Sequence, residues 1–164
     1  MKITVLNTGG TFNKRYNPIL GQLEVPTDNI ALDKIVKSCF NVEFEIKNIV
    51  SKDSLDFTQE DRETILENIK NSASDKIIII HGTDTVDLTA KFIEDKIQGK
   101  KIVFTGAMVP MSIDEVEATM NFSQAIGFLN ARIENGIYLS MHGAVVSYKI
   151  LLKNRELSRF LIVK

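Results

Sequence analysis

Short apolar runs without polar alternation recur along this chain, and helical patterns separate them. The clearest are KIIII at Lys76–Ile80 and KIVFT at Lys101–Thr105, and KITVLN at residues 2–7 is of the same kind. Strands that are apolar on both faces are typical of parallel sheets that helices cover on both sides. The pattern therefore predicts an α/β fold of three layers. We expect a flavodoxin-like or Rossmann-like parallel sheet in a single domain over residues 1–164.

The spacing of apolar residues predicts the other elements. Two further strands are expected, over residues 42–49 and 137–141. Helices are expected over residues 28–39, 58–73, 87–98 and 113–134. Thr58 and Asp61 resemble a capping box at the start of the second helix, and Gly99 is expected to end the third. The pattern weakens after residue 141, and residues 148–164 fit either a hairpin or a strand and tail.

Composition excludes several classes of function. The net charge of −1, from 20 basic and 21 acidic residues, gives no electrostatic basis for binding nucleic acid or an anionic membrane. The lone cysteine, Cys39, precludes an internal disulfide, and with two histidines at no ligand spacing it predicts no metal site. No apolar segment is long enough for a signal peptide or a membrane span. We therefore expect a cytoplasmic protein with neither nucleic-acid nor membrane partners.

The loops that follow the predicted strands are the place to look for a site. In parallel α/β sheets, ligands bind beyond the carboxyl ends of the strands, near a switch in strand order. Topology alone places five loops at that edge, and they hold most of the glycines and several hydroxyls. In chain order they are TGGT, SKDSLDF, HGTDT, TGAMVPMS and MHGAVVSYK.

Two of these loops carry residues suited to nucleophilic chemistry. The glycines of TGGT adopt dihedrals closed to other residues, so their N–H groups are expected to face an oxyanion beside the hydroxyl of Thr11. A threonine hydroxyl is a weak nucleophile until a base takes its proton. Thr83 and Asp84 of HGTDT add a second hydroxyl and a carboxylate. Lys153 is the candidate base, because a desolvated lysine loses its charge near neutral pH.

Each motif also has a purely structural interpretation. TGGT is common as a turn between a strand and a helix, without any nucleophile. His81 is expected to satisfy hydrogen bonds beneath its turn rather than to act in catalysis. Lys149, Lys153 and Arg155 also fit a solvated basic face, as most charge runs do. Pro110 fits a loop that simply stiffens the start of a helix.

Taken together and in this order, TGGT, DSLD, HGTDT and TGAMVP resemble the bacterial-type L-asparaginases. The amidase subunit of archaeal Gln-tRNA amidotransferase shares the pattern, and the resemblance covers essentially the whole chain. It implies an amidohydrolase that cleaves the side-chain amide of L-asparagine, or of a related small amide, through a threonine acyl-enzyme. It also implies that no cofactor or metal takes part.

The resemblance further implies a role for individual residues. The acylating nucleophile falls on Thr11, assisted by Tyr16 from the loop that follows. A triad that handles protons falls on Thr83, Asp84 and Lys153. Lys149 is an alternative position for the lysine. Substrate-binding positions fall on Gly10, Asp53, Ser54, Gly82, Thr83 and Asp84.

Two departures from the family pattern affect the substrate more than the chemistry. Leu55 stands where relatives carry a polar residue, and the smaller C-terminal domain of relatives has no counterpart in residues 1–164. In relatives, that domain of a neighbouring subunit contributes an acidic residue to the substrate's amino group. We therefore expect weak binding of asparagine unless a homo-oligomer, a dimer or tetramer, fills the gap through the apolar segment 159–164. An ordinary core strand is an equally open interpretation of that segment.

Two other classes of function remain open from the residues. One is a module that binds an amino acid without turnover. The other is a subunit of a larger amidase that needs a partner chain to complete its site.

Overall fold

A central sheet organises the computed structural model, which describes residues 1–163. Within those residues six strands pair in the order β4-β1-β5-β6-β7-β8. They are β1 (Lys2–Gly9), β4 (Glu43–Lys52), β5 (Lys76–Ile80), β6 (Lys101–Thr105), β7 (Gly136–Met141) and β8 (Ala144–Ser147). The first five are parallel and β8 is an antiparallel edge strand. Counted along the chain, the parallel strands follow the flavodoxin-like order 2-1-3-4-5, which confirms the predicted fold class.

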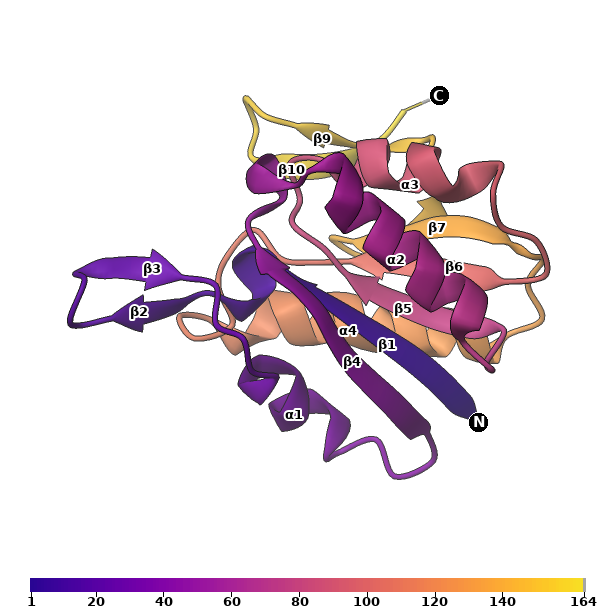
Figure 1. The fold of residues 1–164 in the computed structure, drawn as a ribbon, viewed down its shortest axis with the longest axis horizontal. Coiled ribbons are helices and arrows are strands. Elements are labelled where there is room, and N and C mark those ends of the chain that lie inside the picture. Colours follow the sequence, from indigo (N-terminus) through magenta and orange to yellow (C-terminus); the bar gives the residue numbers. More distant parts are fainter. Residues whose placement is uncertain (164) are drawn as a thin grey trace.

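Helices cover both faces of this sheet. In the described part of the chain they are α1 (Ile30–Val36), α2 (Gln59–Asn71), α3 (Val86–Glu94) and α4 (Glu115–Asn130). Figure 1 shows α2 and α3 over the near face and α4 behind the sheet. Residues of α1 share a buried cluster with α4, so these two helices form the second helical layer. None of the helices within residues 1–163 is long and apolar enough to cross a bilayer.

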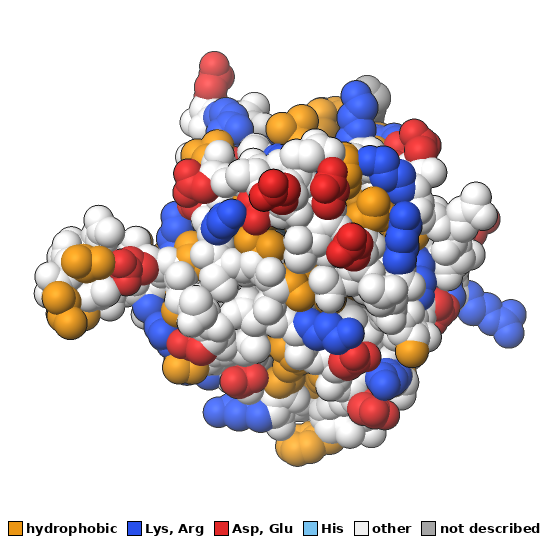
Figure 2. Space-filling model, in the orientation of Figure 1, with side chains coloured by type: hydrophobic (Ala, Val, Ile, Leu, Met, Phe, Trp, Pro, Cys, Tyr) orange, Lys and Arg blue, Asp and Glu red, His pale blue; other side chains and the backbone are white. Residues whose placement is uncertain are grey.

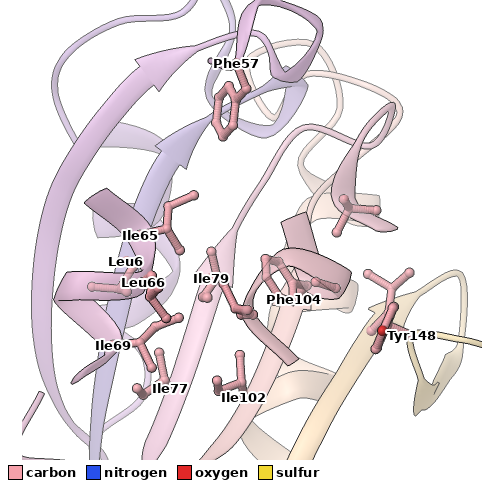
Figure 3. Close-up of a cluster of buried hydrophobic side chains, with 14 of the residues drawn as sticks. Leu6, Phe57, Ile65, Leu66, Ile69, Ile77, Ile79, Ile102, Phe104 and Tyr148 are labelled. Carbon is pink, nitrogen blue, oxygen red and sulfur yellow. The ribbon is translucent and has the colours of Figure 1, made fainter. Parts of the chain in front are cut away.

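The position of β5 in the sheet explains its run of four isoleucines. Successive side chains of a strand point to opposite faces of the sheet. Ile77 and Ile79 accordingly pack beneath α2 and α3, where Figure 3 shows them beside Ile65 and Ile69 of α2. Ile78 and Ile80 belong to the cluster on the other face. Each face of the sheet therefore has its own core, and β5 contributes to both.

Two hairpins lie outside the sheet. The hairpin of β2 (Arg15–Asn17) and β3 (Gln22–Glu24) projects from the body of the protein in Figures 1 and 2, with the exposed side chains of Ile19 and Leu20 at its tip. The sequence patterns did not predict it. The second hairpin, of β9 (Leu151–Asn154) and β10 (Arg159–Ile162), packs against the α3 side of the core through buried residues. Residues 148–163 thus form a hairpin, one of the two arrangements expected.

The helices are shorter than their sequence patterns predicted. The side chain of Asp114 accepts a hydrogen bond from the N–H of Val116, so α4 begins there and not at residue 113. The predicted capping box of α2 is confirmed, with bonds in both directions between Thr58 and Asp61. Helix α3 ends at Glu94, so the prediction that Gly99 ends it is wrong.

Candidate active site

The TGGT, DSLD and HGTDT loops at the carboxyl edge touch one another. Strand β1 lies between β4 and β5, where the strand order reverses, so the loops after these strands are neighbours. A Cβ atom placed on Gly10 would lie 2.6 Å from both Cα and N of Gly82. One placed on Gly82 would lie 2.5 Å from the Oγ of Ser54. TGGT, DSLD and HGTDT therefore meet in contacts that only glycine allows.

The two threonines of TGGT have different environments. Thr8 is fully buried and donates its hydroxyl to the carbonyl oxygen of Ile80 at 2.7 Å, which joins β1 to β5. Gly10 adopts a φ of 71° and starts the 3-10 helix η1 (Thr11–Asn13). The side chain of Thr11 is half-buried, and its hydroxyl has no hydrogen-bond partner within residues 1–163. Thr8 is structural, and Thr11 is the threonine of this turn whose hydroxyl is available.

A pair of buried amides holds the turn from below. Asn7 and Asn13 exchange hydrogen bonds, with Nδ2 to Oδ1 distances of 3.1 and 2.9 Å. Asn13 also donates to the carbonyl of Gly9 at 2.7 Å, and Asn7 donates to Asn29 at 2.8 Å. These bonds fix η1 against the end of β1, so the position of Thr11 is set by the core.

The glycine pair does not offer the oxyanion donors expected of it. The N–H of Gly9 donates to Oδ1 of Asn7 at 3.3 Å, and the N–H of Gly10 donates to the carbonyl of Lys52 at 3.0 Å. Both donors are used inside the protein, so the prediction that they face an oxyanion is wrong. The two glycines instead let the backbone of the turn approach β4 and Gly82 closely.

His81 lies under the HGTDT turn and is fully buried between two aromatic rings, Phe57 and Phe104. Its Nδ1 lies 2.8 Å from the carbonyl oxygen of Gly82, which only accepts, so Nδ1 carries the proton. Its Nε2 lies 2.9 Å from the hydroxyl of Thr89. Burial lowers the pKa of His81 to about 4. The ring is therefore a neutral support for the turn, in agreement with the structural interpretation of this residue.

The triad residues converge from distant parts of the chain. Lys153 Nζ lies 2.9 Å from Thr83 Oγ1 and 3.0 Å from Asp84 Oδ1, although these residues are 70 and 69 positions apart. Strand β9 carries the lysine, and its side chain is only 15% exposed. Lys149 instead pairs with Glu94 at 2.7 Å and is 59% exposed. The structure thus brings Lys153, and not Lys149, to the threonine and aspartate.

Arg155 also binds Asp84. Its NH1 donates to Asp84 Oδ1 at 2.5 Å, and its NH2 donates to the backbone carbonyl of Asp84 at 3.2 Å. Partial burial acts to raise the pKa of Asp84, but the hydrogen bonds from Lys153 and Arg155 outweigh it and hold this pKa below its usual value. Lys149 and Arg155 are exposed, at 59% and 64%, as on a solvated basic face, whereas the side chain of Lys153 is only 15% exposed.

The DSLD loop contributes a second carboxylate and an unpaired hydroxyl. Ser54 is 1% exposed, and its Oγ lies against Gly82 without a hydrogen-bond partner in the described part of the chain. Asp53 accepts a hydrogen bond from Lys14 Nζ at 2.5 Å. Burial acts to raise the pKa of Asp53, and the stronger combined effect of Lys14 and the N–H of Leu55 lowers it. The side chain of Leu55 itself points to solvent.

Tyr16 is not brought to Thr11 in this structure. It lies on β2, opposite Leu23 in the projecting hairpin, and is 64% exposed. Its hydroxyl makes no hydrogen bond within the described residues. Of the predicted catalytic residues, Tyr16 alone lies apart from the loops described above.

Sequence reasoning missed two residues that shape this edge. Lys14 had no signal beyond its nearness to TGGT. Glu117, in the first turn of α4, accepts hydrogen bonds from the N–H groups of Met108 and Val109 at 2.9 and 3.0 Å, which holds the TGAMVP loop. An acidic residue in the first turn of a helix is a general sequence signal for the start of that helix. Glu117 could therefore have been singled out from the sequence more readily than Lys14.

A cavity of about 210 Å³ opens beside the triad, between the start of α3 and the β9–β10 hairpin. Its polar lining includes Thr83, Asp84, Lys153 and Arg155. Among residues 1–163, no group of three or more His, Cys, Asp or Glu side chains is arranged to hold a metal ion. The chemistry that this edge offers is that of hydroxyls, one partly buried lysine, and carboxylates paired with lysine or arginine side chains.

Comparisons with known proteins agree with this geometry. The family described as "Asparaginase, N-terminal" matches residues 2–156. The chain is 28% identical to an L-asparaginase of Thermococcus kodakarensis over 144 residues, which are 85% of this chain and 44% of that protein. It is 30% identical to L-asparaginase 1 of Escherichia coli over 134 residues, covering 76% of this chain and 39% of that protein.

A relative with a different name is similar over the same region. A component of the glutamyl-tRNA(Gln) amidotransferase of Methanococcus vannielii is 28% identical over 149 residues, covering 87% of this chain and 34% of that component. The solved structure of the thermostable L-asparaginase from Thermococcus kodakarensis superposes with a TM-score of 0.86 at 25% identity, covering 99% of this chain and 51% of that one. The chain thus spans about half or less of the length of these proteins. With the family match extending over nearly all of its residues, this chain belongs to the asparaginase family, in the part described as N-terminal.

Proposed function

We propose that this chain carries the catalytic machinery of an amidohydrolase that cleaves the side-chain amide of L-asparagine, or of a related small amide, to the acid and ammonia. The observation that carries the proposal is the contact of Lys153 with Thr83 and Asp84 at 2.9 and 3.0 Å. A general base has to lie within hydrogen-bond reach of the group whose proton it takes, and the partly buried Lys153 has such a contact with a hydroxyl. The resemblance to the asparaginases implies that the same three residues form one group.

In the first half of the reaction, Thr11 is the nucleophile. Its Oγ1 attacks the amide carbon of the substrate and gives up its proton to the Lys153 group. The C–N bond then breaks, the nitrogen leaves as ammonia with the transferred proton, and an acyl ester remains on Thr11. The close contact of Gly10 with Gly82 keeps the nucleophile loop beside the triad loop.

In the second half, water replaces the amine. The same base takes a proton from a water molecule, whose oxygen attacks the ester carbon. The ester C–O bond breaks, the proton returns to Oγ1 of Thr11, and the carboxylic acid product leaves. Thr83 orients the lysine, and Asp84 balances its charge whenever it holds the proton.

The substrate is proposed to lie over the junction of the TGGT, DSLD and HGTDT loops. Ser54 supports this placement, because an unpaired buried hydroxyl costs free energy unless a ligand uses it. Gly10, Gly82 and Asp53 line the same junction. To act on Thr11, Tyr16 would have to move towards it together with the projecting hairpin. The family resemblance is the basis for proposing that Tyr16 assists the nucleophile.

Ammonia release from the isolated chain tests the proposal. With L-asparagine, L-glutamine and other small amides as substrates, we expect release from wild type and none from Thr11→Ala, with Thr11→Ser partly active. Circular dichroism should show the same fold in all three, because a half-exposed loop hydroxyl adds little to stability. Rapid quenching and mass spectrometry should find an acyl adduct on Thr11. Unchanged turnover in Thr11→Ala would contradict the assignment.

A specific observation favours a second candidate, an amidase subunit that needs a partner. The chain is 28% identical over 149 residues to a component of the glutamyl-tRNA(Gln) amidotransferase of Methanococcus vannielii. A second copy of the chain or a partner chain would then complete the substrate site. Light scattering alongside the ammonia assay separates the candidates. Release by a monomer supports an independent enzyme, whereas release only in an oligomer or with an added partner supports the second. Amide binding without release would indicate a binding module.

A further inference from the structure

A second histidine lies at the carboxyl edge of the sheet, in the turn between β7 and β8. His142 and Gly143 form a two-residue hairpin turn with φ values of 51° and 87°. Turns of this kind favour the pair Asn-Gly, because both residues need a positive φ. A residue other than glycine with a positive φ is uncommon, so the side chain that this backbone presents is worth following.

Helix α4 holds both the backbone and the ring of His142. The N–H of His142 donates to Oδ1 of Asn121 at 2.9 Å, and Asn121 is fully buried. One turn earlier on the helix, Oε1 of Glu117 lies 2.8 Å from Nε2 of the ring. The N–H groups of Met108 and Val109 donate to the same carboxylate. The ring is thus fixed to α4 and, through Glu117, to the TGAMVP loop.

The other ring nitrogen of His142 contacts the terminal hairpin. Nδ1 accepts a hydrogen bond from the backbone N–H of Phe160 on β10 at 3.1 Å, and the two rings meet edge to face with centroids 6.0 Å apart. Because Nδ1 accepts, the proton lies on Nε2, which donates it to Glu117. The side chains of His142 and Glu117 are only 24% and 15% exposed, so water competes little for these bonds. One neutral tautomer of His142 therefore joins α4 to β10.

Phe160 is the residue of β10 that lies directly opposite Lys153 of β9. The N–H of Phe160 points away from β9, so the two residues form a non-hydrogen-bonded pair, in which opposite side chains lie closest. Both side chains line the cavity that Thr83 and Asp84 also line. A bond that holds Phe160 in place therefore also holds the part of the hairpin from which Lys153 reaches Thr83 and Asp84.

We propose that His142 is a positioning residue of the active site, which holds β10 to α4 and so keeps Nζ of Lys153 within reach of Thr83. Within residues 1–163 the hydrogen bonds of His142 go to α4 and β10 and not to Thr11 or Lys153, so His142 acts through Phe160. This inference rests on the proposed function, because Lys153 is the base of the proposed reaction.

Two variants, His142→Asn and His142→Gly, form a matched pair that isolates the bond to Phe160. Oδ1 of an asparagine takes the place of the imidazole Nδ1, and asparagine is favoured at this position of the turn. Glycine adopts the same backbone conformation without strain but offers Phe160 no acceptor. Both variants lose the bond to Glu117 and the contact between the rings. The acceptor for Phe160 is therefore the main difference between them.

Tyr148→Phe is the control for a general loosening of the hairpin. The hydroxyl of Tyr148 donates to Oε2 of Glu94 on α3 at 2.9 Å, so this variant also removes one hydrogen bond between the end of the chain and a helix. Tyr148 precedes β9 and does not lie opposite Lys153. Circular dichroism and urea unfolding would establish that all three variants are folded.

Ammonia release would give kcat and KM for L-asparagine in each variant. We expect kcat to fall roughly 10- to 100-fold in His142→Gly, since a displacement of about 1 Å at a reacting group can cost about 10²-fold. KM should change little, because Ser54 and the other residues proposed to bind the substrate make no hydrogen bond to His142 within residues 1–163. His142→Asn should keep most of the wild-type kcat, and Tyr148→Phe should keep all of it.

Nuclear magnetic resonance tests the geometry without any turnover. At mildly alkaline pH, the 15N signals of His142 should report a proton on Nε2 and none on Nδ1, and the amide of Phe160 should exchange slowly with solvent. In His142→Gly this amide should exchange faster, and the side-chain signals of Lys153 should shift. In His142→Asn and Tyr148→Phe both should stay near their wild-type values.

The outcomes separate this inference from the proposed function. Release of ammonia from no amide, together with the expected changes in the Phe160 and Lys153 signals, would contradict the proposed reaction and support the role of His142 in holding Lys153. Without those changes as well, both would fail. An unchanged kcat in His142→Gly would overturn the inference alone. Equal losses of kcat in His142→Gly and in either of the other two variants, or a rise in KM without a fall in kcat, would also overturn it.

Discussion

Mild acid should destabilise this fold through a single side chain, the buried imidazole of His81. Both of its nitrogens have partners, Gly82 and Thr89, and two aromatic rings enclose it. Burial lowers its pKa from 6.5 to about 4. Protonation would place an unpaired charge among apolar groups and take the acceptor nitrogen from Thr89. The folded protein therefore keeps this ring neutral over a range of pH in which the unfolded chain does not.

The size of the effect follows from the two pKa values. Above pH 6.5 the ring is neutral in both states, and its contribution to stability is fully present. Between pH 6.5 and 4 the unfolded chain takes up a proton that the folded protein does not. The free energy of unfolding should then fall by up to ~1.4 kcal/mol per pH unit, or about 3 kcal/mol over the interval. The loss is complete once the pH has passed through the folded pKa.

Urea unfolding followed by circular dichroism at pH 7, 6, 5 and 4.5 measures this change. His81→Asn is the reference, since it keeps a donor for the carbonyl of Gly82 and cannot titrate. Carboxylates with lowered pKa values, such as Asp53 and Asp61, contribute equally to both proteins. The wild type should therefore lose stability more steeply than the variant. Parallel curves for the two proteins would refute the reasoning.

Two further substitutions test the site and the contact that builds it. Lys153→Met should lower kcat for ammonia release by roughly 10²- to 10⁴-fold, the range for loss of a general base, while Lys149→Met should leave it almost unchanged. Equal losses in both would show that Lys153 is not the base. Gly82→Ala should cost about 1–3 kcal/mol in thermal or urea unfolding, because the new Cβ would lie 2.5 Å from the Ser54 hydroxyl. Gly127→Ala, with nothing within 4 Å, should be neutral or stabilising, and an equal loss there would rule out the clash as the cause.

The parts of the fold that were predicted from sequence are those with strong local patterns. Strands β5 and β6 were predicted to the residue, because continuous apolar runs mark strands that are buried on both faces. The hairpin of β2 and β3 was missed, since three-residue strands of polar and exposed side chains carry no periodicity. Helix ends were misplaced by a few residues, because caps depend on side-chain bonds such as that of Asp114.

Motifs indicated most of the candidate site, and the position of Lys153 beyond the fifth predicted strand indicated the lysine. TGGT and HGTDT indicated Thr11, Thr83 and Asp84, and the geometry joins the last two to Lys153. The contacts of Arg155 with Asp84 and of Lys14 with Asp53 cross 71 and 39 residues of sequence. Such ion pairs form only when separate loops come together in the folded protein, so no local sequence pattern predicts them. The use of the glycine N–H groups inside the protein was likewise invisible without coordinates.

The central place of β1 has a consequence for synthesis on the ribosome. The first strand to be synthesised, β1, lies between β4 and β5. The hydroxyl of its Thr8 has no native acceptor until Ile80, 72 residues later in the sequence, has been made. At about 5–20 residues per second, this wait lasts about 4–14 s, and Lys153 follows Thr83 by a further 70 residues. Even after β4 has been made, β1 keeps one unpaired edge on a strand with apolar faces, and such an edge is open to wrong pairing. Chaperone capture of nascent chains should therefore concentrate on lengths before β5 has left the exit tunnel.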